Sequence, residues 1–171
     1  MIICKSILVT CTVLAFGLFL SNKTQAQDAG LVGWWKFDEG SDDIAYDASG
    51  NGYNGTINGN PEWASGIVGH ALEFDGIDDF VVVTRMVGTD FTLMAWIKTD
   101  QPGDVVEGDY PATGGDGLFF VGVLGGATNN DFILALVDTQ LIFGVGDYSA
   151  GPTNHDVVTG DWIHIALTRT A

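Results

Sequence analysis

Short apolar runs recur along the chain after residue 30, and clusters of Gly, Asp and Asn separate them. Runs rich in Val, Ile, Phe, Thr and Trp are typical of strands, and the clusters are typical of turns. Helix signals are almost absent from this part of the sequence. The pattern therefore predicts an all-β protein of antiparallel strands, arranged as a sandwich or a barrel. We expect strands at residues 31–37, 71–74, 80–84, 91–99, 117–124, 132–137, 140–145 and 161–169.

Some of these segments support more detailed predictions. The runs LALV and QLIF flank Asp138 and Thr139, and a connection of this length is typical of a tight hairpin. In FTLMAWIKT both alternating faces are largely apolar, which predicts a central strand. The alternation in WIHIALT predicts a strand with one face in the core and a wetter face that carries His164.

The first 26 residues carry a different pattern. Lys5 ends a short basic start, residues 7–20 are almost all apolar, and the segment TQA places small residues at the usual cleavage spacing. This apolar run of about 14 residues is shorter than the roughly 18 that a membrane-spanning helix needs. We therefore expect residues 1–26 to be a cleaved signal peptide and residues 27–171 to form one domain. The domain would be secreted or extracellular, with the periplasm or the cell surface as alternatives; a lipid anchor at Cys11 is a minor one.

Cysteine use and charge narrow the function classes. Both cysteines, Cys4 and Cys11, lie in the expected signal peptide, so the exported part can form no disulfide and no thiolate site. The chain has 6 basic and 22 acidic residues, a formal net charge of −16. Loss of Lys5 and Lys23 with the signal peptide leaves 4 basic and 22 acidic residues, a net charge of −18. Such acidity disfavours nucleic acids and anionic membranes as partners. It favours solubility, and it can also attract divalent cations.

Five sequence blocks carry a family resemblance. In chain order they are LVGWWKFDEG, DASGNGYNGT, GHALEFDGIDDFVVV, FTLMAWIKT and GDWIHIALTRT. In this order and spacing they resemble the LamG-like jelly-roll domains of the concanavalin A-like lectin and glucanase superfamily. The resemblance runs from about residue 31 to the last residue, with a loose match over residues 100–160. It implies a jelly-roll sandwich of two curved antiparallel sheets. It also implies a non-catalytic module that binds extracellular glycan or protein, often with a calcium ion.

The resemblance also concerns the end of the chain. Domains of this family continue past a block such as WIHIALTRT through at least one further strand. The resemblance therefore implies a jelly roll that is incomplete at its C-terminus and a chain that is a fragment of a larger extracellular protein. We expect an unpaired sheet edge beside residues 161–169.

The loop DASGNGYNGT leaves two interpretations open. Its oxygen-bearing residues follow the offsets of an EF-hand calcium loop, but the last position of that motif is Asn58 in place of Glu, and no helix flanks the loop. In the first interpretation Asp47 and Asn51 hydrogen-bond their own backbone within a turn. In the second they form part of a calcium site that other loops complete, with Asp38 and Asp75 as further ligands.

The acids of EFDGIDD raise an enzymatic alternative. Glu73, Asp75 and Asp78 loosely resemble the paired acids of laminarinase-type relatives, and glycoside hydrolysis needs two carboxylates that flank the scissile bond. The glucanase pattern asks for a second Glu that is absent here. We therefore expect solvent-facing acids and no catalytic residues. A glycoside hydrolase acting on polysaccharide, or the accessory domain of one, is kept as the alternative.

Aromatic residues outside the strand patterns are the ligand-binding candidates. Four of the five tryptophans fall within strand patterns, where core packing is the commoner use of the side chain. Trp63, Tyr110 and Tyr148 fall in expected loops, where an aromatic ring could stack on a sugar.

Overall fold

The computed structural model describes residues 5–10, 30–88, 90–104, 116–121, 132–145 and 148–170. All regular elements in these ranges are strands that pair antiparallel, which confirms the predicted all-β, antiparallel class. They are β1 (Lys5–Thr10), β2 (Ile44–Ala45), β3 (Gly55–Asn58), β4 (Glu62–Ser65), β5 (His70–Asp75), β6 (Phe80–Val82), β7 (Phe91–Lys98), β8 (Asp116–Val121), β9 (Phe132–Val137), β10 (Gln140–Val145), β11 (Tyr148–Ala150) and β12 (Ile163–Arg169). Over the described ranges, no helix is long and apolar enough to cross a bilayer.

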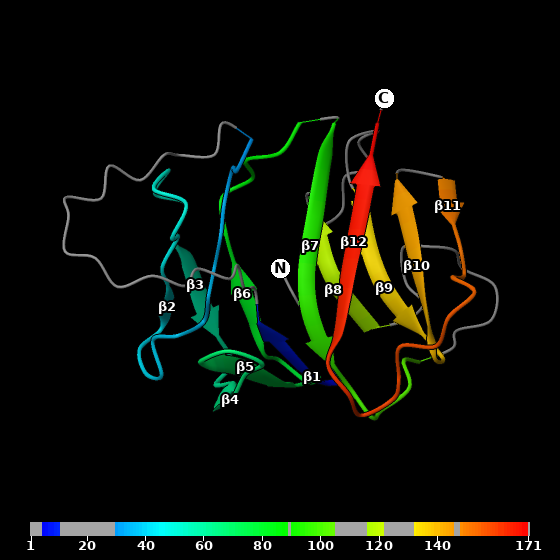
Figure 1. Cartoon of the computed structure of the whole chain (residues 1–171), viewed down its shortest axis with the longest axis horizontal. Coiled ribbons are helices and arrows are strands. Elements are labelled where there is room, and N and C mark those ends of the chain that lie inside the picture. The colour runs from blue at the N-terminus through cyan, green and yellow to red at the C-terminus, as the bar shows by residue number, and fades with distance from the viewer. Residues whose placement is uncertain are drawn as a thin grey trace.

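The strands form three sheets, whereas the family resemblance implies two (Figure 1). The first sheet has the order β12-β7-β1-β5-β4, the second β11-β10-β9-β8, and the third β2-β3-β6. In the described part of the chain the strands of the third sheet, which are 2, 4 and 3 residues long, pair only with one another. In Figure 1 the long strands β7 and β12 lie in front of β8 and β9 of the second sheet, and β10 and β11 appear to the right of β12.

One hydrophobic core joins the three sheets. It contains Phe37, Ala45, Ile57, Leu72, Phe74, Val81, Ala95, Ile97, Leu118, Leu134, Leu136, Leu141, Val157 and Ile165. Because side chains alternate along a strand, a sheet covered on one face buries every second residue. This alternation is seen in β12, where Ile165 is buried and His164 is exposed, as predicted.

The local predictions for the hairpin and for the central strand are confirmed. Val137 at the end of β9 pairs with Gln140 at the start of β10, so Asp138 and Thr139 form the connection. Asp138 has a φ of 51°, in the left-handed region that tight hairpin turns use. Strand β7 pairs with β1 on one side and with β12 on the other, and it is therefore central. Strand β12 is the edge of its sheet in the described part of the chain.

The predicted strand over residues 31–37 is wrong. This segment makes one isolated bridge, between Trp35 and Asp47. The ladder stops because the N–H of Trp34 donates to the side chain of Asp47 and because Phe37 has a φ of 55°, outside the strand region. The other predicted strands correspond to β5, β6, β7, β8, β9, β10 and β12, and residues 122–124 lie outside the described residues. Strands β2, β3, β4 and β11 were not predicted.

Strand β1 comes from the segment that the sequence assigns to a signal peptide and places outside the domain. It lies between β5 and β7 and pairs with both. Its residues Ile7, Leu8 and Val9 are aliphatic, and such residues favour a strand position between two neighbours.

Candidate functional site

A small hollow of about 190 Å³ opens beside the turn that joins β3 to β4. It is lined by Asp42, Asp43, Ile57, Asn58, Gly59, Asn60, Pro61 and Trp63. Sites for whole drug-sized ligands usually occupy about 300–1,000 Å³, so this hollow suits one small polar unit of a larger ligand. The lining combines two carboxylates, two amides and one indole, and so offers hydrogen-bonding groups beside an aromatic face.

Trp63 forms the aromatic wall of the hollow. It lies in β4, opposite Leu72 of β5, and is half-buried against the hydrophobic core. The sequence placed Trp63 in a loop, and that placement is wrong. The polar residues next to Trp63 in EWAS give the segment little strand propensity, so the sequence pattern does not predict a strand. The strand forms because β5 supplies a pairing edge. A ring held by a strand and by core packing is a rigid surface for a ligand.

The carboxylates of the hollow come from the segment that precedes β2. Asp42 has a φ of 80°, which turns the chain, and the carbonyl oxygen of Asp43 accepts a hydrogen bond of 2.8 Å from the N–H of Ile57. This bond attaches the segment to β3. Both Asp42 and Asp43 are exposed, so their carboxylates are accessible to a ligand.

Another part of the lining is the turn between β3 and β4, which the buried carboxylate of Asp79 holds by a hydrogen bond. Asp79 is 4 % exposed, and its carboxylate accepts hydrogen bonds from the N–H of Asn60 at 2.7 Å and from the N–H of Asp75 at 2.9 Å. Gly59 has a φ of 90°, and a Cβ at this position would overlap Asp79. The turn therefore requires glycine both for its backbone conformation and for its close approach to the carboxylate.

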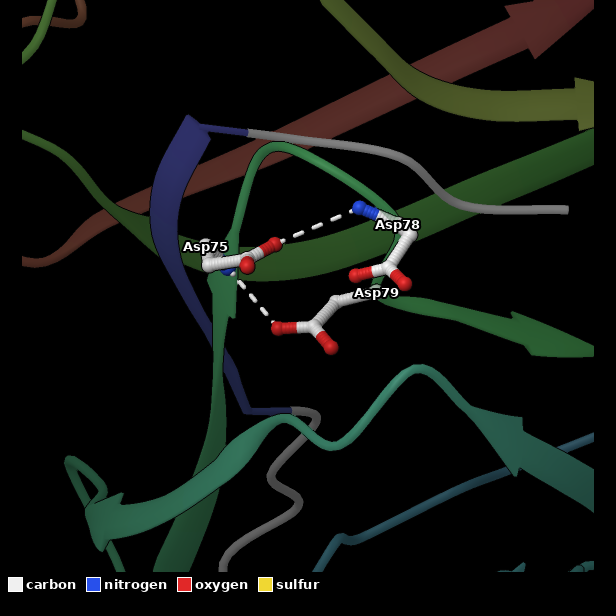
Figure 2. A group of neighbouring side chains, drawn as sticks. All are labelled: Asp75, Asp78 and Asp79. Atoms are coloured by element: carbon white, nitrogen blue, oxygen red, sulfur yellow. Dashed lines mark hydrogen bonds between the residues drawn. The ribbon is translucent and has the colours of Figure 1, made fainter.

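Asp79 also belongs to a cluster of three carboxylates with Asp75 and Asp78 (Figure 2). One oxygen from each lies within 4.8 Å of the others, at the end of β5 and in the turn that leads to β6. Asp75 and Asp78 are exposed, and Asp79 is buried. The Asp75 carboxylate accepts hydrogen bonds from the N–H of Ile77 at 2.8 Å and of Asp78 at 3.4 Å. Three carboxylates at this spacing could hold a divalent cation.

Of the four residues that the sequence offered as calcium ligands, Asp75 alone belongs to this cluster in the described part of the chain. Asp78 and Asp79 were not offered as ligands. The two consecutive aspartates after Ile77 could have indicated the cluster. They lie in the tight turn after β5, and such a turn brings its acidic residues close to Asp75 at the end of that strand. Asp38 has a different role, since its Oδ1 accepts a hydrogen bond of 3.1 Å from the N–H of His70.

Asp47 organises its own loop through its carboxylate. Oδ1 accepts hydrogen bonds from the N–H of Trp34 and of Ser49, and Oδ2 accepts from the Ser49 hydroxyl and from the N–H of Tyr53. Burial raises the pKa of Asp47, but the hydrogen bonds from Ser49, Trp34 and Tyr53 outweigh it and keep the pKa below its ordinary value.

Asn51 completes this loop. Its Nδ2 donates to the carbonyl oxygens of Leu31 and Val32, at 3.1 and 2.9 Å. Asp47 thus accepts backbone hydrogen bonds from its own loop, as the turn interpretation of DASGNGYNGT expects, whereas the side chain of Asn51 joins the loop to Leu31 and Val32. A calcium ion at Asp47 and Asn51 stays a prediction.

The two remaining aromatic candidates are Tyr148 and Tyr110. Tyr148 begins the short strand β11, so its predicted position in a loop is wrong. Strand β11 forms because β10 supplies a pairing edge, in which Val145 lies opposite Tyr148. Tyr110 lies outside the described residues. Glu73, the residue of the enzymatic alternative, is half-buried in β5 opposite Glu62 of β4, and neither lines the hollow.

Comparison of the chain with protein-family models, with curated proteins and with solved structures finds no match.

Proposed function

We propose that this chain is an exported, LamG-like jelly-roll module that binds an extracellular glycan without cleaving it. The observation that carries the proposal is the hollow in which Trp63 stands beside Asp42, Asp43 and the amides of the β3–β4 turn. The resemblance of the five sequence blocks supports the same function. The alternative ligand for this surface is an extracellular protein.

The chemistry of the hollow suits a sugar ring. An indole presents an apolar face, which can cover the C–H face of a sugar. Ionised carboxylates accept hydrogen bonds from hydroxyl groups, and bonds to a charged acceptor are stronger than bonds between neutral groups. Asn58 is held in place because its Nδ2 donates to the carbonyl oxygen of Thr56 at 3.0 Å. A rigid ring and fixed polar groups limit the entropy that binding costs.

The charge of the site selects among glycans. Asp42 and Asp43 line the hollow, and the chain carries a net charge of −16. Like charges repel, so we expect neutral glycans to bind and glycans that carry carboxylate or sulfate groups to bind weakly. A higher salt concentration screens this repulsion and should therefore reduce the difference in affinity between neutral and anionic glycans.

We further propose calcium as the cation of the cluster formed by Asp75, Asp78 and Asp79. Calcium prefers oxygen ligands and accepts flexible arrangements of carboxylates and backbone carbonyls. Asp79 connects the cluster to the hollow, because the same carboxylate binds the N–H of Asn60. A bound ion would therefore neutralise charge next to the sugar site and stabilise its wall.

The test is a glycan array with the exported protein, followed by titration of its strongest ligands. Asp43→Asn removes one charge from the hollow at an exposed position and should weaken binding about tenfold or more. Asp161→Asn removes one charge from an exposed position outside the hollow and is the matched control. An array without any glycan signal would direct the search to protein ligands.

The enzymatic alternative has its own readout. Incubation with polysaccharides should release no reducing ends under the proposed function. Release that disappears in Glu73→Gln would establish the hydrolase instead, because a catalytic carboxylate cannot be replaced by an amide.

A further inference from the structure

The hollow beside the β3–β4 turn presents two carboxylates that have no role in holding the described fold. Asp42 and Asp43 both line the hollow, and both are exposed. In the described part of the chain, neither carboxylate accepts a hydrogen bond or belongs to an ion pair. The carboxylates of Asp47 and Asp79, in contrast, accept hydrogen bonds from backbone N–H groups. The charges of Asp42 and Asp43 are therefore available to a ligand.

The turn between β3 and β4 removes hydrogen-bond donors from the hollow and leaves acceptors. The Nδ2 of Asn58 donates to the carbonyl oxygen of Thr56, and the Oδ1 of Asn58 remains as an acceptor. The backbone N–H of Asn60 donates to Asp79, and Pro61 has no backbone N–H. Both charged residues of the lining are acids. The lining is therefore rich in acceptor oxygens and carries negative charge.

Trp63 adds a surface that also attracts positive charge. Its side chain lines the hollow and is half-buried against the hydrophobic core. The face of an indole ring carries partial negative charge, and it attracts a cation that lies within about 6 Å of the ring centroid. The indole and the two carboxylates thus favour the same ligand charge.

We propose that the hollow binds the protonated amino group of an amino sugar, so that its preferred ligand is a glycan with free amines. This inference rests on glycan binding at the hollow and names the class of glycan. An ammonium group has three donors and no acceptor, and it therefore matches a lining of acceptor oxygens. Its hydrogen bonds to carboxylates are stronger than those of a neutral hydroxyl. N-acetylation removes the charge, so an N-acetylated glycan should bind less tightly.

Binding in the hollow differs from a diffuse attraction of amines to an acidic protein. The hollow has a volume of about 190 Å³ and suits one small unit of a larger ligand. We therefore expect one bound ligand per chain. A diffuse attraction would involve many of the 22 acidic residues, and the loss of any one exposed charge would weaken it equally.

The test compares two trisaccharides, a β-1,4-linked trisaccharide of glucosamine and its fully N-acetylated counterpart. Each is titrated into the native chain by calorimetry and by NMR of the indole N–H of Trp63, a resonance that Trp63→Phe identifies by its loss. We expect one site per chain, a shift of that resonance and an affinity about tenfold or more higher for the amino trisaccharide. A pH above the pKa of the sugar amine should abolish this preference.

Two variants locate the preference in the hollow. Asp42→Asn and Asp43→Asn each remove one charge, and Asn tolerates the φ of 80° at position 42 as Asp does. Each variant should reduce the ratio of the two affinities about threefold or more. Asp161→Asn removes an exposed charge outside the hollow and should keep the native ratio.

The other outcomes separate this inference from the proposed function. Equal affinity of the native chain for the two trisaccharides would overturn the inference and leave glycan binding in place. An equal loss of preference in Asp161→Asn and Asp43→Asn would also overturn it, because the attraction would then be diffuse. Trilysine that binds as tightly as the amino trisaccharide, and that loses affinity in Asp43→Asn, would assign the hollow to a basic protein segment instead. A chain that binds no sugar of the glycan array would contradict the proposed function itself.

Discussion

The buried carboxylate of Asp79 accepts a hydrogen bond of 2.7 Å from the backbone N–H of Asn60, although the two residues are 19 positions apart. This bond joins the turn between β5 and β6 to the turn between β3 and β4. One of these turns carries the acidic cluster and the other forms a wall of the hollow. The stability of the hollow and the state of the cluster are therefore expected to be coupled.

Replacement of Asp79 should be costly to stability. Asp79→Ala leaves the N–H groups of Asn60 and Asp75 without their acceptor, and a buried unsatisfied group costs about 1–3 kcal/mol. Urea denaturation of the full chain measures the change in the free energy of unfolding. Asp78→Asn, at an exposed neighbour, is the control and should stay within about 0.5 kcal/mol of the native chain. Equal effects of the two variants would show that Asp79 is not the anchor of the turn.

Gly59→Ala tests the close approach of the turn to Asp79. Gly59 and Gly50 both have a positive φ, of 90° and 89°, but a Cβ on Gly50 would meet nothing within 4 Å. Gly50→Ala therefore reports backbone strain alone, about 1–2 kcal/mol. Gly59→Ala adds an overlap with Asp79 and should lower the free energy of unfolding further. Equal losses in the two variants would contradict the tight contact.

The pH dependence of stability should reflect Asp47. Its folded-state pKa is held below the ordinary value of 3.8, so its carboxylate stabilises the fold above that pH. The contribution is lost as the pH falls from 3.8 through the lower folded-state pKa. Asp47→Asn should reduce the free energy of unfolding near neutral pH, and the difference from the native chain should shrink in acid. A difference that is constant between neutral pH and pH values below 3.8 would contradict this role.

The hydrogen bonds of Asp47 and Asp79 show which contacts could be predicted from the sequence and which could not. The loop at Asp47 was predictable because its partners Ser49 and Tyr53 are close in the chain. The β9–β10 hairpin was predictable for the same reason. The bond from Asn60 to Asp79 was not, because it depends on how β3 and β6 pair, and sequence periodicity does not report pairing between distant strands.

Strand β4 and the segment 31–37 both show that local strand propensity does not determine which segments pair. The segment EWAS has weak strand propensity, yet it pairs with β5 along its length. Residues 31–37 have strong strand propensity, yet they form one bridge, because Asp47 captures a backbone N–H that a ladder would need. Tertiary pairing outweighs local propensity at both places, so Trp63 was expected in a loop and the hollow was not foreseen.

Calcium should raise the melting temperature if the acidic cluster binds it. Ligand that binds only the folded state stabilises it by about 2.7 kcal/mol at 100 times the dissociation constant. Melting in millimolar calcium and in chelator measures the shift, and Asp78→Asn should reduce it. A shift that survives in Asp78→Asn but disappears in Asp47→Asn would move the ion to the DASGNGYNGT loop. Identical melting in calcium and in chelator would exclude both sites.

The most direct test of glycan binding at the hollow is calorimetric titration with the neutral oligosaccharides that an array identifies. The titration compares the native chain with Asp43→Asn, Trp63→Phe and the control Asp161→Asn. Trp63→Phe keeps an aromatic side chain in β4 and reduces the ring surface that faces the hollow. We predict binding to the native chain and to Asp161→Asn with equal affinity, and a loss of about tenfold or more in Asp43→Asn. Native affinity in both Asp43→Asn and Trp63→Phe would show that the glycan binds elsewhere and would contradict the proposed site.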